Sequence, residues 1–307
     1  MVMDSAKGYF RCLLGALFQI SYAAVMREMS DEKLMQRYAK GDAKAFDLLY
    51  ARHRAPLYRY FIRQLNDPAT ANDLYQGAWE KIIKARRMPA DAFLERARIV
   101  NPQMLEQYSE GFSKSVIVLT IHQGNWEWML HGATTHFQIP IDPVYKPLHN
   151  KSADKMIYEI RSQFGSRPLS MDESVKDIIR RRREFRIFVM VADQSPIRSE
   201  RGYWTRFMNQ EANFYLGAET IAKMTRFPVL YAQCRRVRTG YYEIEFKELA
   251  KPPYDKASND ITDRYVELAE QAIRAEPESW LWSNRRWKRD RAKEEATERE
   301  ANVGTAE

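Results

Sequence analysis

The chain has 307 residues, of which 45% are hydrophobic and 12% aromatic, so it can bury a sizeable core in one large or two smaller domains. Its formal net charge of +8 favours anionic partners, such as acidic proteins, anionic lipid headgroups or nucleic acid, without choosing among them. The two cysteines, Cys12 and Cys234, exclude a disulfide framework and a cysteine-rich metal site, and they are compatible with a reducing, intracellular environment.

An apolar stretch lies near the start of the chain, at residues 12–26. It is shorter than the roughly 20 residues that a membrane-spanning helix needs. A secretory signal is also disfavoured, because no clean small-x-small cleavage site follows and Asp4 weakens the basic region. We therefore expect residues 1–29 to form an apolar helix that either contacts a membrane surface or is buried in the protein.

Residues 30–88 follow a helical pattern throughout. Aromatic and aliphatic side chains recur at helical spacing between residues 46 and 62. A turn at residues 66–68 separates that helix from another, which reaches residue 83. The sequence therefore predicts an all-helical segment before the chain changes character near residue 89.

After Pro89, strands alternate with helices. The expected strands are residues 116–121, 185–192, 228–233 and 241–246, and the expected helices are residues 126–137, 152–164, 173–183, 214–224 and 261–275. This alternation predicts an α/β fold with a mainly parallel sheet flanked by helices. The charged tail at 291–307 contains no aromatic residue and is expected to be a frayed helix or disordered.

His122 follows the first of these strands, at the point where a helix is about to begin. Ligands of open α/β sheets bind at the carboxyl ends of the strands. Histidine can accept a proton near neutral pH, and a carboxylate can fix its tautomer, so the spacing from His122 to Glu127 suggests a base with an orienting partner. The alternative is an ordinary hydrogen-bonded histidine, with Glu127 on a solvated helix face. A metal site is not expected, because His131 and His136 belong to no recognisable metal-binding motif.

Several further blocks accompany His122 and Glu127. They are VYKP at 144–147, VADQSP at 191–196, WTRFMNQ at 204–210, FPV at 227–229 and WLWSNRRWK at 280–288. Together and in this order they resemble the lipid A biosynthesis acyltransferase family, the lauroyl and myristoyl transferases of Gram-negative bacteria. The resemblance covers about residues 90–290 and implies a glycerolipid acyltransferase-like α/β domain, for which we expect the bounds 89–290. This chain has Phe207-Met208-Asn209 where many members carry Phe-x-Gly.

The resemblance implies that a fatty acyl chain moves from acyl carrier protein, or a similar thioester, to a hydroxyl of a lipid A precursor or related glycolipid. No cofactor is implied, and the expected location is the cytoplasmic face of the bacterial inner membrane. His122 would be the general base and Glu127 its orienting partner. The backbone around Gly124 and Asn125 would supply donors to the oxyanion that forms during transfer.

Four further polar residues are candidates for substrate binding. The resemblance suggests Lys146 and Arg161 as anchors for phosphate on the acceptor or the carrier, although each could be a solvated surface charge. Asp193 and Gln194 end a predicted strand at the same sheet edge as His122, which suits either a polar role in the cleft or a helix cap.

Residues 30–87 carry a second resemblance, to the second conserved region of extracytoplasmic-function sigma factors. Tyr58, Asp73, Gln76 and Trp79 are similar to the surface by which that family binds RNA polymerase. The alternative, which we favour slightly, is that Tyr58 and Trp79 pack in a helical core, since large aromatic residues at helical spacing are usually buried. The remaining promoter-reading elements and a C-terminal helix-turn-helix are not visible in the sequence. The alternative function, a sigma-like polymerase-binding protein with an inactive acyltransferase body, is therefore disfavoured. Arginine-rich runs lie at residues 180–183, 235–238 and 285–291. We interpret them first as surfaces that contact a membrane or acyl carrier protein, second as solvated charged faces, and third as nucleic-acid contacts.

Overall fold

The computed structural model describes residues 85–147, 151–196 and 202–281, together with residues 28–30, 33–34, 37, 48, 286–287, 289–291 and 294. The chain divides into two compact units, residues 1–79 with 148–157, and residues 80–147 with 158–307. The predicted apolar helix lies outside the described residues except for residues 28 and 29, and the four polymerase-binding candidates lie outside them altogether. No helix within the described part of the chain has the length and hydrophobicity needed to cross a bilayer.

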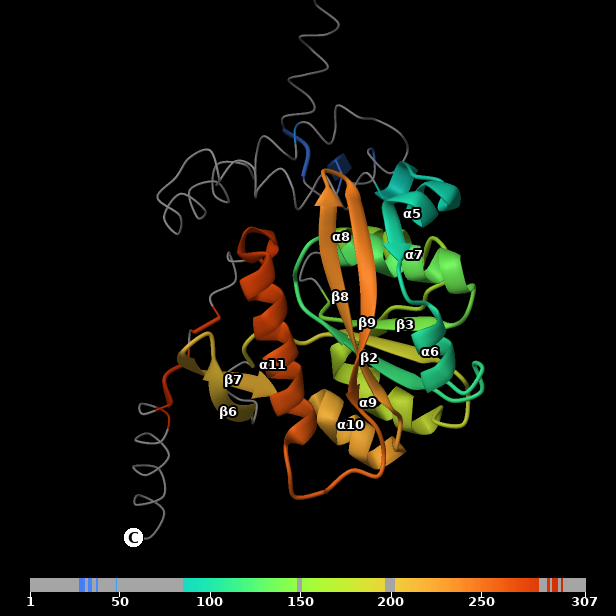
Figure 1. The fold of residues 1–307 in the computed structure, drawn as a ribbon. Helices are drawn as coiled ribbons and strands as arrows, with labels where there is room; N and C mark the ends of the chain where they lie inside the picture. Colours follow the sequence, from blue (N-terminus) through green and yellow to red (C-terminus); the bar gives the residue numbers. More distant parts are fainter. Residues whose placement is uncertain are drawn as a thin grey trace, which may run out of the picture. The chain divides into compact units, whose positions relative to one another are not determined.

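A seven-stranded sheet forms the centre of the second unit (Figure 1). In spatial order its strands are β1 (Ala97–Ile99), β9 (Tyr241–Ala250), β8 (Val229–Arg238), β2 (Val116–Thr120), β5 (Ile187–Val191), β3 (Ile141–Tyr145) and β4 (Leu169–Ser170). Neighbouring strands run parallel except β8 and β9, which form an antiparallel hairpin. The prediction of a mainly parallel sheet is confirmed. The strands β1, β3 and β4 were not predicted: β1 and β4 have only three and two residues, and Asp142 and Pro143 interrupt the apolar pattern of β3.

Helices cover the sheet. They are α5 (Ala90–Arg96), α6 (Gln103–Tyr108), α7 (Trp126–Phe137), α8 (Lys151–Ser162), α9 (Met171–Arg180), α10 (Gly217–Thr225) and α11 (Asp260–Ala275), followed by the short 3₁₀ helix η1 (Pro277–Ser279). The predicted bounds of α7 are confirmed, and those of α8, α9 and α11 are within three residues. The predicted start of α10 at residue 214 was wrong, because Phe214 and Tyr215 pair as strand residues instead.

A separate two-stranded hairpin joins β6 (Gly202–Phe207) to β7 (Gln210–Tyr215). Its two turn residues, Met208 and Asn209, have φ angles of 51° and 66°. Two positive φ angles match the right-handed twist of a two-residue hairpin, and asparagine tolerates this backbone better than most residues. Asn209 therefore satisfies a local turn requirement at the position where the resemblance described above leads us to expect glycine.

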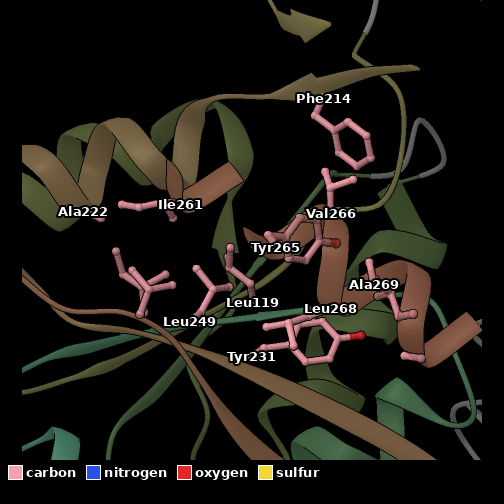
Figure 2. Close-up of a cluster of buried hydrophobic side chains, with 14 of the residues drawn as sticks. Leu119, Phe214, Ala222, Tyr231, Leu249, Ile261, Tyr265, Val266, Leu268 and Ala269 are labelled. Atoms are coloured by element: carbon pink, nitrogen blue, oxygen red, sulfur yellow. The ribbon is translucent and has the colours of Figure 1, made fainter. Parts of the chain in front are cut away.

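The main core lies between the sheet and helices α10 and α11 (Figure 2). Leu119, Tyr231 and Leu249 project from the strands toward this core, and every side chain of β2 is buried. The α11 residues that face it recur at helical spacing: Ile261, Tyr265, Val266, Leu268, Ala269, Ala272 and Ile273. This packing fixes α11, and with it η1 and Trp280, close to the carboxyl end of β2.

Candidate active site

Strand register brings His122 and Asp193 together. β2 and β5 are parallel neighbours, and Thr120 pairs with Val191 at the end of both strands. His122 and Asp193 each lie two residues beyond that last pair. The same number of residues therefore carries each side chain past the same edge of the sheet, where ligands of such sheets bind.

The Asp193 carboxylate holds the His122 ring through a short hydrogen bond. Nδ1 of His122 lies 2.6 Å from Oδ1 of Asp193. Oδ2 accepts the backbone N–H of His122 at 3.2 Å and Nε1–H of Trp280 at 2.8 Å. With the proton on Nδ1, the ring leaves Nε2 as an acceptor, and the Gln194 side-chain nitrogen stands 3.4 Å from it. The His122 side chain is 17% exposed, so a substrate hydroxyl can approach Nε2.

Asp193 stays ionised although its side chain is only 3% exposed. Burial alone raises the pKa of Asp193, but the charge of His122 and the hydrogen bonds from its ring, from Trp280 and from the His122 backbone outweigh burial and hold the pKa below its ordinary value. A carboxylate with fixed donors cannot rotate freely. It therefore fixes the orientation and the tautomer of the imidazole.

Glu127 has a different partner from the one expected. Its carboxylate receives a two-pronged contact from Arg161 on α8, with Nη2–Oε1 at 2.6 Å and Nε–Oε2 at 3.0 Å. Burial raises the pKa of Glu127, but the Arg161 guanidinium outweighs burial and lowers it below the ordinary value. The orienting hydrogen bond assigned to Glu127 from its spacing is made by Asp193, because the first turn of α7 directs Glu127 toward Arg161.

The loop between His122 and α7 is held by internal hydrogen bonds. The backbone N–H of Gln123 donates to Ile121, that of Gly124 to Ser279, and that of Asn125 to Cys234 Sγ. The backbone N–H groups of Gly124 and Asn125, which we expected to be open to an oxyanion, are therefore already bonded within the protein. Gly124 has a φ of +62°, and a Cβ there would lie 2.9 Å from the Cys234 carbonyl oxygen, so this position requires glycine.

Asn125 has a local structural role. It is the N-cap of α7, and its Oδ1 accepts the backbone N–H of Trp128 at 3.1 Å.

Lys146 directly follows β3, the other neighbour of β5, and is exposed. A side chain in that position can reach an anion at the carboxyl edge of the sheet. Within the described residues, no group of three histidine, cysteine or acidic side chains is arranged to hold a metal ion.

Two residues in contact with this site received no individual role from the sequence. Trp280 is 2% exposed and donates to Asp193, while the backbone of Gln123 forms a bridge to that of Trp280. Tyr265 on α11 donates its hydroxyl to the Thr120 carbonyl at the end of β2. The block at 280–288 contributed to the family resemblance, but nothing in the sequence indicated that Trp280 contacts Asp193.

A second histidine is buried on α7, one turn after Glu127. His131 is fully buried between the rings of Phe93 and Phe164, with ring centroids at 4.8 and 5.4 Å. Neither of its ring nitrogens finds a hydrogen-bond partner among the described residues. Burial lowers the pKa of His131 to about 4, against a partial opposing effect of Glu127, so the folded protein holds this ring neutral.

The stability of the protein should therefore fall in mild acid. Between about pH 6.5 and pH 4, His131 is protonated in the unfolded chain but neutral in the folded protein. The neutral, buried His131 therefore makes a pH-dependent contribution to the free energy of unfolding. This contribution is present in full above pH 6.5, and about 2–3 kcal/mol of it is lost on acidification to about pH 4.5. Urea unfolding of His131→Phe should show a flatter pH dependence over this range. His136→Gln, which changes an exposed histidine on the same helix, should behave as wild type; an equally steep loss in His131→Phe would contradict the prediction.

Comparison with known families gives one match. A sequence model described as bacterial lipid A biosynthesis acyltransferase matches residues 73–289, which is well over half of the chain and includes every residue of the candidate site. The match begins before the expected boundary at residue 89. The resemblance of residues 30–87 to sigma factors finds no support. No curated protein matches the chain.

Proposed function

Since the chain belongs to the bacterial lipid A biosynthesis acyltransferase family and is an acyltransferase, we propose that it moves a fatty acyl chain from an acyl carrier protein thioester to a hydroxyl of a lipid A precursor. The observation that carries the proposal is the His122–Asp193 pair at the carboxyl edge of the sheet. Acyl transfer to a hydroxyl needs a base beside the attacking oxygen, and the partly exposed His122 side chain offers Nε2 as an acceptor in a fixed orientation.

The proposed reaction moves one proton through His122. The acceptor hydroxyl attacks the thioester carbonyl carbon while Nε2 takes its proton. The new carbon–oxygen bond forms, and the carbonyl oxygen carries negative charge in the tetrahedral intermediate. The carbon–sulfur bond then breaks, and the departing thiolate recovers the proton from the imidazolium. Asp193 stabilises the imidazolium in between, and no other reactant is consumed.

The Glu127–Arg161 pair is proposed to shape the neighbouring wall of the site. The Arg161 side chain is 20% exposed beside an 8% exposed Glu127, and its guanidinium also lies 5.7 Å from the Tyr145 ring centroid. A partly exposed guanidinium beside a carboxylate can still attract an anionic group of a substrate. Together with Lys146 it suits a phosphate of the acceptor or of the carrier.

Lipid analysis tests the function directly. Lipid A from cells with and without the gene is compared by mass spectrometry, with the gene restored as wild type or as His122→Gln. The expected result is a species lighter by one acyl chain in the deletion, corrected by the wild-type gene alone. Unchanged lipid A in the deletion, with no transfer from acyl carrier protein thioesters by the purified protein, would overturn the proposal.

We also propose that the protein works at an anionic membrane surface on the cytoplasmic side. β8 extends past the carboxyl end of β2 to a hairpin tip, where Val237 is 55% exposed between the exposed residues Arg236 and Arg238. An apolar residue flanked by arginines suits contact with anionic headgroups. An acceptor with lipid chains resides in the membrane, so an enzyme bound to the membrane surface could reach it there.

Vesicle sedimentation tests this membrane contact. The protein should pellet with anionic vesicles and be released by salt, because exposed charges are screened over about 8 Å at physiological ionic strength. Arg238→Gln should weaken binding about fivefold, since each basic residue near an anionic surface contributes about 1 kcal/mol. Val175→Ser, which changes an exposed valine on α9, serves as the control. Absence of binding at low salt would contradict the proposal.

A further inference from the structure

Arg286 is a buried arginine beside the candidate active site. Its side chain is among the largest that are fully buried, and the residue is only 2% exposed. None of its three guanidinium nitrogens finds a hydrogen-bond acceptor among the described residues. Burying a charged group without a hydrogen-bonded partner is costly, so its surroundings should show what compensates for it.

The neighbours of Arg286 are mostly aromatic. The centre of the guanidinium lies 4.0 Å from the ring centroid of Phe214 and 5.5 Å from that of Phe207, both on the β6–β7 hairpin. The Phe207 ring in turn contacts Trp280, whose indole donates to Asp193. Ring faces attract a cation, but they do not neutralise it. Arg286 therefore belongs to the aromatic shell behind the Asp193 carboxylate.

Two ionisable groups face Arg286 across this shell. Asp193, after β5, attracts it, and the Tyr265 hydroxyl on α11 couples to both. Burial lowers the pKa of Arg286 to about 10, while Asp193 opposes that change, so the guanidinium is charged at neutral pH. Burial also raises the pKa of Tyr265 well above its ordinary value, which keeps that hydroxyl neutral. Among the described residues, Asp193 is the carboxylate that acts on Arg286, and the contacts from Arg286 to Phe207, from Phe207 to Trp280 and from Trp280 to Asp193 connect the two groups.

We propose that Arg286 is a positioning residue: its buried positive charge behind Asp193 opposes protonation of the His122 ring, which the Asp193 carboxylate by itself would favour. The inference rests on the proposed role of His122 as a base. A carboxylate alone favours the imidazolium, which cannot accept a proton from a hydroxyl. A third, positive charge in the same low-dielectric region shifts the balance back to the neutral ring without touching the substrate.

Ring titration by NMR tests this role without any substrate. The His122 signal is identified among the five histidines by its loss in His122→Gln, and its titration midpoint is then compared between variants. The neutral variants Arg286→Met and Arg286→Gln should move the midpoint upward by about 0.5 to 1 in pH, and Arg286→Lys should return it toward wild type. Arg264→Met removes the same charge from an exposed position on α11 and should leave the midpoint unchanged.

The same variants separate this inference from the proposed function. In an acyl-transfer assay, the acid limb of the pH profile should move upward by the same amount in Arg286→Gln. Absence of transfer by the wild-type protein would overturn the proposed function, whereas the ring titration would still measure the effect of Arg286. An unchanged midpoint in a folded neutral variant would overturn the inference, because a purely structural arginine alters stability alone.

A stability measurement decides the question if neither neutral variant folds. Asp193→Asn would leave the charge of Arg286 uncompensated, so adding Arg286→Gln to Asp193→Asn should raise the melting temperature. A lower melting temperature in the double variant would show that Arg286 does not depend on the Asp193 charge, and would overturn the inference.

Discussion

His122→Gln is expected to lower kcat for acyl transfer by about 10²- to 10⁴-fold, the range that loss of a general base typically costs. Glutamine keeps a polar side chain of similar length but cannot take a proton from the attacking hydroxyl. KM should change little, because the ring acts on the reacting proton rather than on the bulk of the substrate. Single-turnover rates with an acyl carrier protein thioester measure the chemical step.

The matched control is His136→Gln, an exposed histidine near the end of α7. It should retain wild-type kcat and the wild-type melting temperature. His122→Gln should also melt close to wild type, since the Asp193 carboxylate keeps its bond to Trp280. A kcat within a few fold of wild type in folded His122→Gln would exclude His122 as the base.

The longer elements of the α/β region could be predicted from the sequence because their patterns are strong. β2 is an uninterrupted apolar run, and α11 repeats its buried residues at helical spacing. The hairpin β6–β7 was missed because Trp204, Arg206 and Glu211 give it neither clean alternation nor a continuous apolar run. Its turn has no glycine, which removed the usual signal for a two-residue hairpin.

The candidate site could be predicted in part. His122 and Asp193 were both placed at strand ends from local sequence, and the structure puts them at the same edge. Their pairing was beyond the sequence, because it depends on β2 and β5 being neighbours and on their register. Glu127 shows the converse limit: a spacing of a few residues gives proximity along the chain, but the turn into α7 decides where the carboxylate points.

Asp193→Asn is expected to cost about 10³- to 10⁴-fold in kcat, because a comparable aspartate-to-asparagine change in the serine protease triad costs about 10⁴-fold through the wrong histidine tautomer. Asparagine can turn its amide N–H toward Nδ1 of His122. Nδ1 then becomes the acceptor and Nε2 carries the proton, so the ring no longer offers a base to the hydroxyl. The ring nitrogen shifts of His122 report this change directly by NMR.

Glu127→Gln is the comparison that separates the two carboxylates. It removes the charge opposite Arg161, whose side chain is 20% exposed. Because this breaks a largely buried ion pair, the free energy of unfolding should fall by roughly 3 kcal/mol. It leaves the Asp193 contacts to His122 in place, so the proton should stay on Nδ1. The double variant Glu127→Gln with Arg161→Met should recover much of the lost stability, since no unpaired charge remains. A tautomer change in Glu127→Gln, with none in Asp193→Asn, would return the orienting role to Glu127 and contradict the assignment of Asp193.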